Sequence, residues 1–147
     1  MGLITDYFIA DSDTEAARFL DGGVHGAGLD QDDLHEAKGI DPFVMLGTLE
    51  AALTELPYAE ISGDLTPPVG LGDSGASGIV RVRGTLTTAL ADLAPGRVPG
   101  VAATWSSTEE FGPDADEEAV AEFLHGLSGL ARRAMVQGRE LYCWFSV

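Results

Sequence analysis

The side chains in this chain that could perform acid–base or metal chemistry are three histidines and a large excess of carboxylates. The densest group is Asp32-Asp33-Leu34-His35-Glu36, where one turn of helix would place Asp32 beside His35 or Glu36. Such a group could hold a hard cation or let a histidine move protons. A run of acidic residues more often forms a solvated face, and we favour that interpretation. The other two histidines stand apart from it, so the spacing predicts no metal site.

A second candidate group combines Trp105 with the adjacent acids Glu109 and Glu110. An aromatic ring beside carboxylates can bind a sugar or a cation where the site is concave. We favour the competing interpretation, an acidic loop that follows a strand whose tryptophan packs in the core. Folding could still bring both groups together. We therefore keep His35, Glu36, Trp105, Glu109 and Glu110 as candidate ligand-binding or partner-binding residues, and assign no residue a catalytic, cofactor-binding or metal role.

Two further motifs predict structure better than they predict chemistry. Residues 70–75 read Gly-Leu-Gly-Asp-Ser-Gly and satisfy the dinucleotide-binding pattern, but they precede an expected strand instead of linking a strand to a helix. We expect a loop there and no cofactor. The single cysteine, Cys143, stands in an apolar run and is expected to be a small buried side chain in a reducing compartment, the cytoplasm.

The charge balance limits the classes of partner. Twenty-four Asp and Glu against eight Lys and Arg leave a formal net charge of −16 on 147 residues. A protein that tracks nucleic acid or an anionic membrane needs a basic face, so both classes of partner are excluded. No window approaches the roughly 18 uncharged residues of a membrane helix. A basic protein is the partner that this charge favours.

The hydrophobic pattern predicts the elements that would position these residues. Residues 3–9 and 140–147 are apolar on both faces, which is typical of interior strands, and we expect the two termini to pair or lie close in one sheet. Residues 79–83 alternate as a third strand. Residues 42–55, 85–93 and 117–137 have helical spacing, and the last of these carries acids at its start and ends at Gly138.

Weaker signals complete the expected architecture. A Ser12-x-x-Glu15 capping box predicts a short helix after the first strand. We expect a turn or two of helix within residues 31–38, short strands at 58–62 and 101–106, and a loop over residues 63–78. The sum is a single α+β domain over residues 1–147, with a mixed sheet whose interior holds the N- and C-terminal strands, packed against a long C-terminal helix and shorter helices.

The order of these elements resembles the YfbM-like family of small bacterial proteins of unknown function. The resemblance lies in the Met-Gly start, the apolar helix through Phe43, Leu46 and Leu49, the strand and helix over residues 79–93, and the final helix and strand over residues 123–147. The Trp and His associated with that family's central helix are not found around Phe43. The resemblance implies an α+β fold and transfers no activity and no catalytic residue.

Two functions remain open at this level. We favour a non-catalytic module that binds a basic protein through an acidic surface, for instance an immunity-like or inhibitor-like protein, because the charge excess lacks any accompanying reactive cluster. The alternative is a small-molecule-binding protein or a hydrolytic enzyme with a site assembled near Trp105, Glu109, Glu110 and His35. A homodimer along the long helix is a third arrangement that the sequence does not separate from the first.

Overall fold

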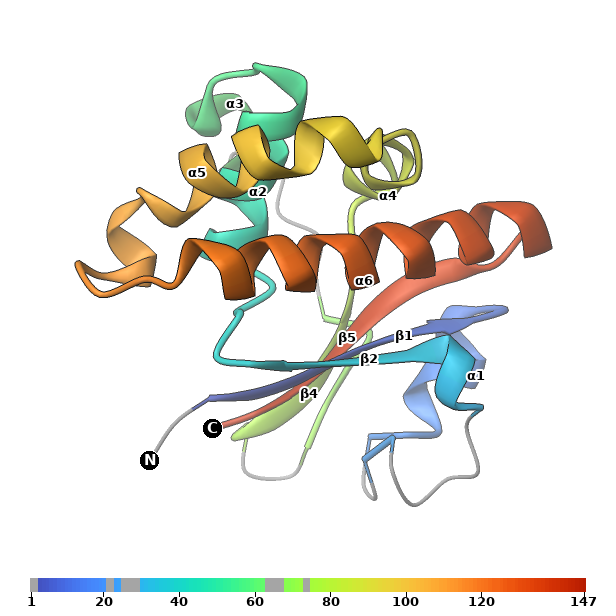
Figure 1. The fold of residues 1–147 in the computed structure, drawn as a ribbon. Helices are drawn as coiled ribbons and strands as arrows, with labels where there is room; N and C mark the ends of the chain where they lie inside the picture. The colour runs from blue at the N-terminus through green and yellow to red at the C-terminus, as the bar shows by residue number, and fades with distance from the viewer. Residues whose placement is uncertain (1–2, 21–22, 25–29, 63–67, 73–74) are drawn as a thin grey trace.

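The fold is built around a five-stranded sheet, seen in a computed structural model that describes residues 3–20, 23–24, 30–62, 68–72 and 75–147 (Figure 1). The strand order is β2-β1-β5-β4-β3, and every pairing is antiparallel. The strands are β1 (Ile4–Ala10), β2 (Leu34–Lys38), β3 (Gly70–Leu71), β4 (Ser77–Arg81) and β5 (Glu140–Ser146). The single α+β domain is as expected, but the sheet is antiparallel and not mixed.

The terminal strands β1 and β5 pair with each other inside the sheet, as predicted. Each strand buries both of its faces. Tyr7 and Ile9 of β1 belong to the main core, whereas Phe8 and Ala10 belong to a second, smaller core on the opposite face. Because successive side chains of a strand point to opposite faces, a strand covered on both sides is apolar over most of its length; in β1, Thr5 and Asp6 are the buried polar exceptions.

Helices cover the sheet in two layers on one face and one short helix on the other (Figure 1). The long helix α6 (Glu117–Gln137) lies directly on β1, β2 and β5. Helices α4 (Gly84–Ala91) and α5 (Val98–Ser106) pack on α6, and α2 (Val44–Thr54) packs against both and against α3 (Tyr58–Ser62). Helix α1 (Asp13–Ala17) lies on the opposite face, and short 3₁₀ turns occupy η1 (Gln31–Asp33), η2 (Pro95–Arg97) and η3 (Glu109–Phe111).

The helix ends follow the capping signals in the sequence. Ser12 Oγ accepts a hydrogen bond from the Glu15 amide at 3.2 Å, and Asp116 Oδ1 accepts from two amides at the start of α6. These bonds satisfy amides that have no partner within the helix. Gly138 ends α6 with a φ of 67°, a left-handed conformation that glycine adopts without strain.

The expected strand at residues 101–106 is wrong, because this segment is the helix α5. Its β-branched and aromatic residues favour a strand locally. The buried positions Val98, Val101, Ala102 and Trp105 nevertheless have helical spacing, and Pro99 stands in the first turn, where a missing N–H costs nothing. The helical pattern becomes visible only when the segment is read from residue 98.

Two shorter segments also differ from expectation. Residues 34–38 form the edge strand β2 instead of a helical turn, since the edge of β1 offers unpaired backbone groups to them. Residues 58–62 form the helix α3 instead of a strand. Part of the expected loop over residues 63–78 is a short antiparallel hairpin of β3 and β4, so the glycines at 70–75 connect two strands and lead into no helix.

Candidate functional site

The candidate residues come from separate elements, and because His35 and Glu36 are neighbours on one strand, their side chains point to opposite faces of the sheet, with only His35 on the side of α6. His35 and Glu36 lie on β2, Trp105 lies on α5, and Glu109 and Glu110 lie on η3. Of the two histidines that stand apart from this group in the sequence, His25 lies outside the described residues. His125 is exposed on α6, and it lies beside the apolar stripe of that helix, not within it.

An aromatic cluster around Phe123 brings two of these candidates together. The His35 ring stacks on Phe123 with centroids 5.1 Å apart, and the Trp105 ring lies 6.0 Å from the same ring. Tyr7 meets Phe123 edge-on at 5.8 Å, and Phe111 meets Trp105 edge-on at 4.9 Å. We call these residues the Phe123 cluster. It joins β1, β2, α5, η3 and α6, and its rings contribute packing energy to the main core.

Trp105 has a structural role in this cluster. Its side chain is fully buried, and its indole N–H donates to the Met45 carbonyl at 2.9 Å and lies 3.2 Å from Thr48 Oγ1. The only polar group of the ring is therefore engaged with α2. Trp105 packs in the core as expected, although on a helix, and presents no polar atom to a ligand.

His35 is held flat against α6 by a glycine. A Cβ placed on Gly126 would lie 2.6 Å from His35 Nε2 and closer still to Cε1, so only glycine leaves room for the imidazole. Burial lowers the pKa of His35, while the backbone of Phe123 and the charge of Glu36 act in the other direction. Nε2 is buried without a hydrogen-bond partner within the described structure. Burial thus favours the neutral form of the ring, which packs against α6 with Nε2 shielded from solvent.

The remaining candidates, Glu109 and Glu110, are exposed, and they are the first residues of a larger acidic surface. No Lys or Arg occurs between Arg97 and Arg132 in the sequence. Among the described residues, no ion pair engages any carboxylate of this stretch. We call the exposed carboxylates of η3 and the start of α6 the acidic end: Glu109, Glu110, Asp114, Asp116, Glu117, Glu118 and Glu122.

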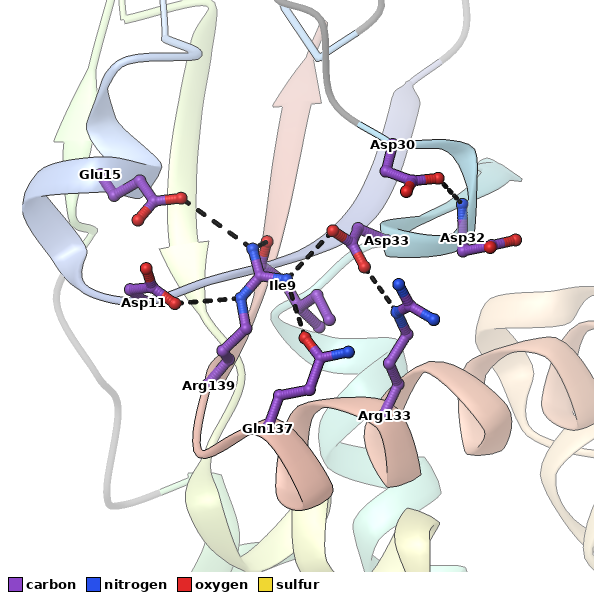
Figure 2. A network of polar contacts seen from close by, with 9 residues as sticks. All are labelled: Ile9, Asp11, Glu15, Asp30, Asp32, Asp33, Arg133, Gln137 and Arg139. Carbon is purple, nitrogen blue, oxygen red and sulfur yellow. Dashed lines mark hydrogen bonds and ion pairs between the residues drawn. The ribbon is translucent and has the colours of Figure 1, made fainter.

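The arginines, by contrast, are largely engaged elsewhere. Figure 2 shows Asp33 between Arg133 Nε at 2.6 Å and Arg139 Nη1 at 3.0 Å, where α6 ends and β5 begins. Arg139 also pairs with Asp11 at 3.2 Å and donates to the Ile9 carbonyl at 3.1 Å. Burial by itself would raise the pKa of Asp33, but the hydrogen bonds and charges of the two arginines outweigh it and lower that pKa.

This arginine network was not predicted from the sequence. The partners Asp33 and Arg133 stand 100 residues apart, so no local spacing reveals them. Asp33 was expected only as part of an acidic helical turn with Asp32 beside His35. In the structure Asp33 is the last residue of η1 and His35 lies on the strand β2 that follows. Asp33 therefore binds the arginines, whereas His35 packs on Phe123.

A second buried carboxylate is also neutralised internally. Glu50 of α2 is fully buried and accepts hydrogen bonds from Arg83 Nε and Thr85 Oγ1, each at 3.0 Å. Arg81 pairs with Asp13 at 3.8 Å on the opposite face of the sheet. Both arginines of the β4 region thus serve structural ion pairs, which tie α2 and α1 to the strand.

Comparison with known proteins adds no family to these observations. Neither the family models, nor the curated proteins, nor the solved structures gave a match. The resemblance to the YfbM-like family therefore stays a prediction. Over the described residues, no three His, Cys, Asp or Glu side chains gather as metal ligands, and no helix is long and apolar enough to cross a membrane.

Proposed function

We propose that this protein is a non-catalytic module that binds a basic protein partner through the acidic end. The observation that carries the proposal is the contrast in charge pairing within the part of the chain that the structure describes. Carboxylates at the other end of α6 are held by arginines, whereas those of the acidic end have no ion pair. Like charges gathered on one surface repel one another, and a basic partner relieves that repulsion.

The geometry of the acidic end suits fast recognition. Its carboxylates lie on η3 and on the first turns of a long helix, which are anchored to the core by Phe111 and Phe123. An acidic patch on a fixed scaffold steers a basic partner and accelerates encounter. An immunity-like or inhibitor-like protein, which must meet a basic target quickly, is the concrete form of the proposal.

The experiment compares two variants that lose the same number of negative charges. In the acidic-end variant, Glu109, Glu110, Glu118 and Glu122 become Gln. In the matched control, exposed acids elsewhere are neutralised: Glu55→Gln, Glu60→Gln, Asp92→Asn and Glu140→Gln. Immobilised wild type is expected to retain a defined set of basic proteins from the source cells at low ionic strength and to release them at high ionic strength.

The proposal expects the acidic-end variant to lose that set and the control to keep it. Cross-linking and mass spectrometry of the retained complexes should place the partner's lysines against η3 and the start of α6. Equal loss in both variants would mean that net charge alone attracts the proteins. If immobilised wild type retained no protein at low ionic strength, a binding role would be refuted. The negative charge would then serve only to keep the protein soluble.

The alternative function, small-molecule binding or hydrolysis near Trp105, Glu109, Glu110 and His35, has one observation in its favour: His35 and Trp105 share the Phe123 ring. Against it, the indole N–H is bonded to α2 and the imidazole lies against Gly126. Both rings are therefore committed to packing, and we prefer the binding module.

The proposal treats the protein as a monomer in a reducing compartment. The apolar stripe of α6 is already buried between the sheet and helices α4 and α5, so we do not propose a dimer along this helix. Cys143 is a free, buried thiol whose pKa is raised, first of all by burial. A thiol of this kind is inert and is compatible with the cytoplasm, which we propose as the location.

A further inference from the structure

An open groove lies between α2 and α5, and none of its lining residues belongs to the acidic end. It has a volume of about 280 Å³ and is lined by Ala52 of α2, by Gly96 and Arg97 of η2, and by Gly100, Val101 and Thr104 of α5. None of these residues belongs to the Phe123 cluster. This volume lies just below the roughly 300 to 1,000 Å³ of typical ligand sites, so only a small molecule would fit.

The groove is held open by the packing beside it. The indole of Trp105 binds Met45 and Thr48, which fixes the spacing between α5 and α2. One turn farther along each helix, Ala52 and Val101 line the groove instead of filling it. A Cβ on Gly96 or on Gly100 would meet no atom within 4 Å. The gap therefore persists because rigid helices cannot collapse onto small side chains.

The lining of the groove contains one charged residue, the cation Arg97. Arg97 is exposed, and within the described structure its guanidinium forms neither a hydrogen bond nor an ion pair. Thr104 offers a hydroxyl that donates to no protein group there, and apolar surface comes from the half-buried Ala52 and from the small exposed part of Val101. A guanidinium binds a carboxylate through two parallel hydrogen bonds. The strongly negative charge of the whole protein opposes a ligand with several negative charges.

We propose that the groove between α2 and α5 binds a small aliphatic monocarboxylate, with its carboxylate on Arg97 and its alkyl chain on Val101 and Ala52. The groove shares no residue with the acidic end, so either proposal can be refuted without the other.

The test is a titration of ¹⁵N-labelled protein with sodium butyrate, followed by amide chemical shifts. The amides of Gly96, Gly100 and Thr104 are expected to shift and to saturate. Sodium chloride at equal ionic strength and 1-butanol, which keeps the alkyl chain without the charge, should not give this response. Arg97→Gln should weaken butyrate binding at least about tenfold, because it removes a charge-assisted bond. Arg18→Gln, which neutralises another exposed arginine, should leave binding unchanged.

A second variant separates binding from folding. Gly100→Leu should fill the groove from α5 and abolish saturation, while the fold is kept because the added side chain meets open space. The proposal is refuted if butyrate gives no saturable shift, if butanol acts equally, or if Arg97→Gln binds as well as Arg18→Gln does. Sodium sulfate that binds more tightly than butyrate would also refute it, since the site would then be one for inorganic anions.

Discussion

Asp33 and His35 are two residues apart in the chain, and the fold lowers the pKa of each for a different reason. Around Asp33, two arginines outweigh burial and favour the charged carboxylate. Around His35, burial disfavours the charged imidazolium. In both cases the folded state holds its proton less tightly than the unfolded chain does. Both groups therefore stabilise the fold at neutral pH and lose that contribution as the pH falls.

For Asp33, the contribution is present above its unfolded pKa of about 3.9 and is lost as the pH falls through the lower folded value. We expect Asp33→Asn to reduce the free energy of unfolding by about 1 to 3 kcal/mol at pH 7, because two arginines lose a charged partner. Urea unfolding measures the difference. Asp32→Asn, at an exposed neighbouring position, is the control and should change little. If the difference in free energy of unfolding between wild type and Asp33→Asn stayed constant below about pH 3, it would not come from the charged form of Asp33.

For His35, the contribution is present above its unfolded pKa of about 6.5 and declines as the unfolded chain takes up a proton. The free energy of unfolding of wild type should therefore fall between about pH 7.5 and pH 5.5. We expect His35→Gln to show a smaller fall over this interval, measured by urea unfolding at each pH. His125→Gln, at an exposed site, should keep the wild-type slope. Equal slopes in all three proteins would show that His35 does not titrate as its surroundings indicate.

At the scale of elements, the contact between β2 and α6 depends on the absence of a side chain at Gly126. An added methyl group would collide with the His35 ring, whereas at Gly129 on the same helix it would meet no atom within 4 Å. Helix propensity favours alanine by up to about 1 kcal/mol at both positions. The two glycines thus form a matched pair in which only the contact with His35 differs.

We expect Gly129→Ala to raise the free energy of unfolding by up to about 1 kcal/mol, and Gly126→Ala to lower it by about 1 to 3 kcal/mol through overpacking. Thermal and urea unfolding give both values. In a His35→Ala background the collision is gone, so Gly126→Ala should become neutral or stabilising there. A penalty that persists in that background would assign the effect to the helix itself and not to β2.

The elements that the sequence predicts well are those whose burial repeats over many residues. Strands β1 and β5 are apolar on both faces because each is covered twice, and α6 shows its stripe over five turns. Short segments carry too few residues for such a pattern. Residues 34–38 form a strand only because they pair with the edge of β1, where Glu36 is opposite Asp6, 30 residues earlier in the chain. A prediction from the neighbouring residues alone does not include that pairing.

The candidate site was predictable in its residue types and not in its contacts. Trp105 and His35 were named from the sequence, but Phe123, which joins them, was read only as one position of a helical stripe. The Asp33–Arg133 pair joins residues that no spacing rule connects. The pairing of α5 with α2 through the Trp105 indole likewise depends on the packed helices, so the groove beside it was not expected.

At the scale of the whole molecule, the charges are arranged along α6. Its first turns belong to the acidic end, whereas Arg133, near its other end, lies with Arg139, just before β5, around Asp33 (Figure 2). Glu117 and Glu118 in the first turn of α6 interact favourably with the positive end of the helix dipole, whereas the last turn holds no basic residue. Acids occur at both ends of α6, but arginines accompany them only at the C-terminal end, so the acidic end is the one without counter-charges among the described residues.

This arrangement predicts that salt stabilises the protein. Between about 0.02 M and about 0.3 M sodium chloride the Debye length falls below about 10 Å, which screens repulsion between exposed carboxylates more than it screens the partly buried arginine network. We expect the free energy of unfolding to rise over this interval. The rise should be smaller in the acidic-end variant than in the matched control, although both lose the same charge, because repulsion is greatest where carboxylates lack counter-charges. Urea unfolding at each salt concentration measures both responses. An identical response in the two variants would mean that net charge acts uniformly and that the acidic end is not a distinct electrostatic surface.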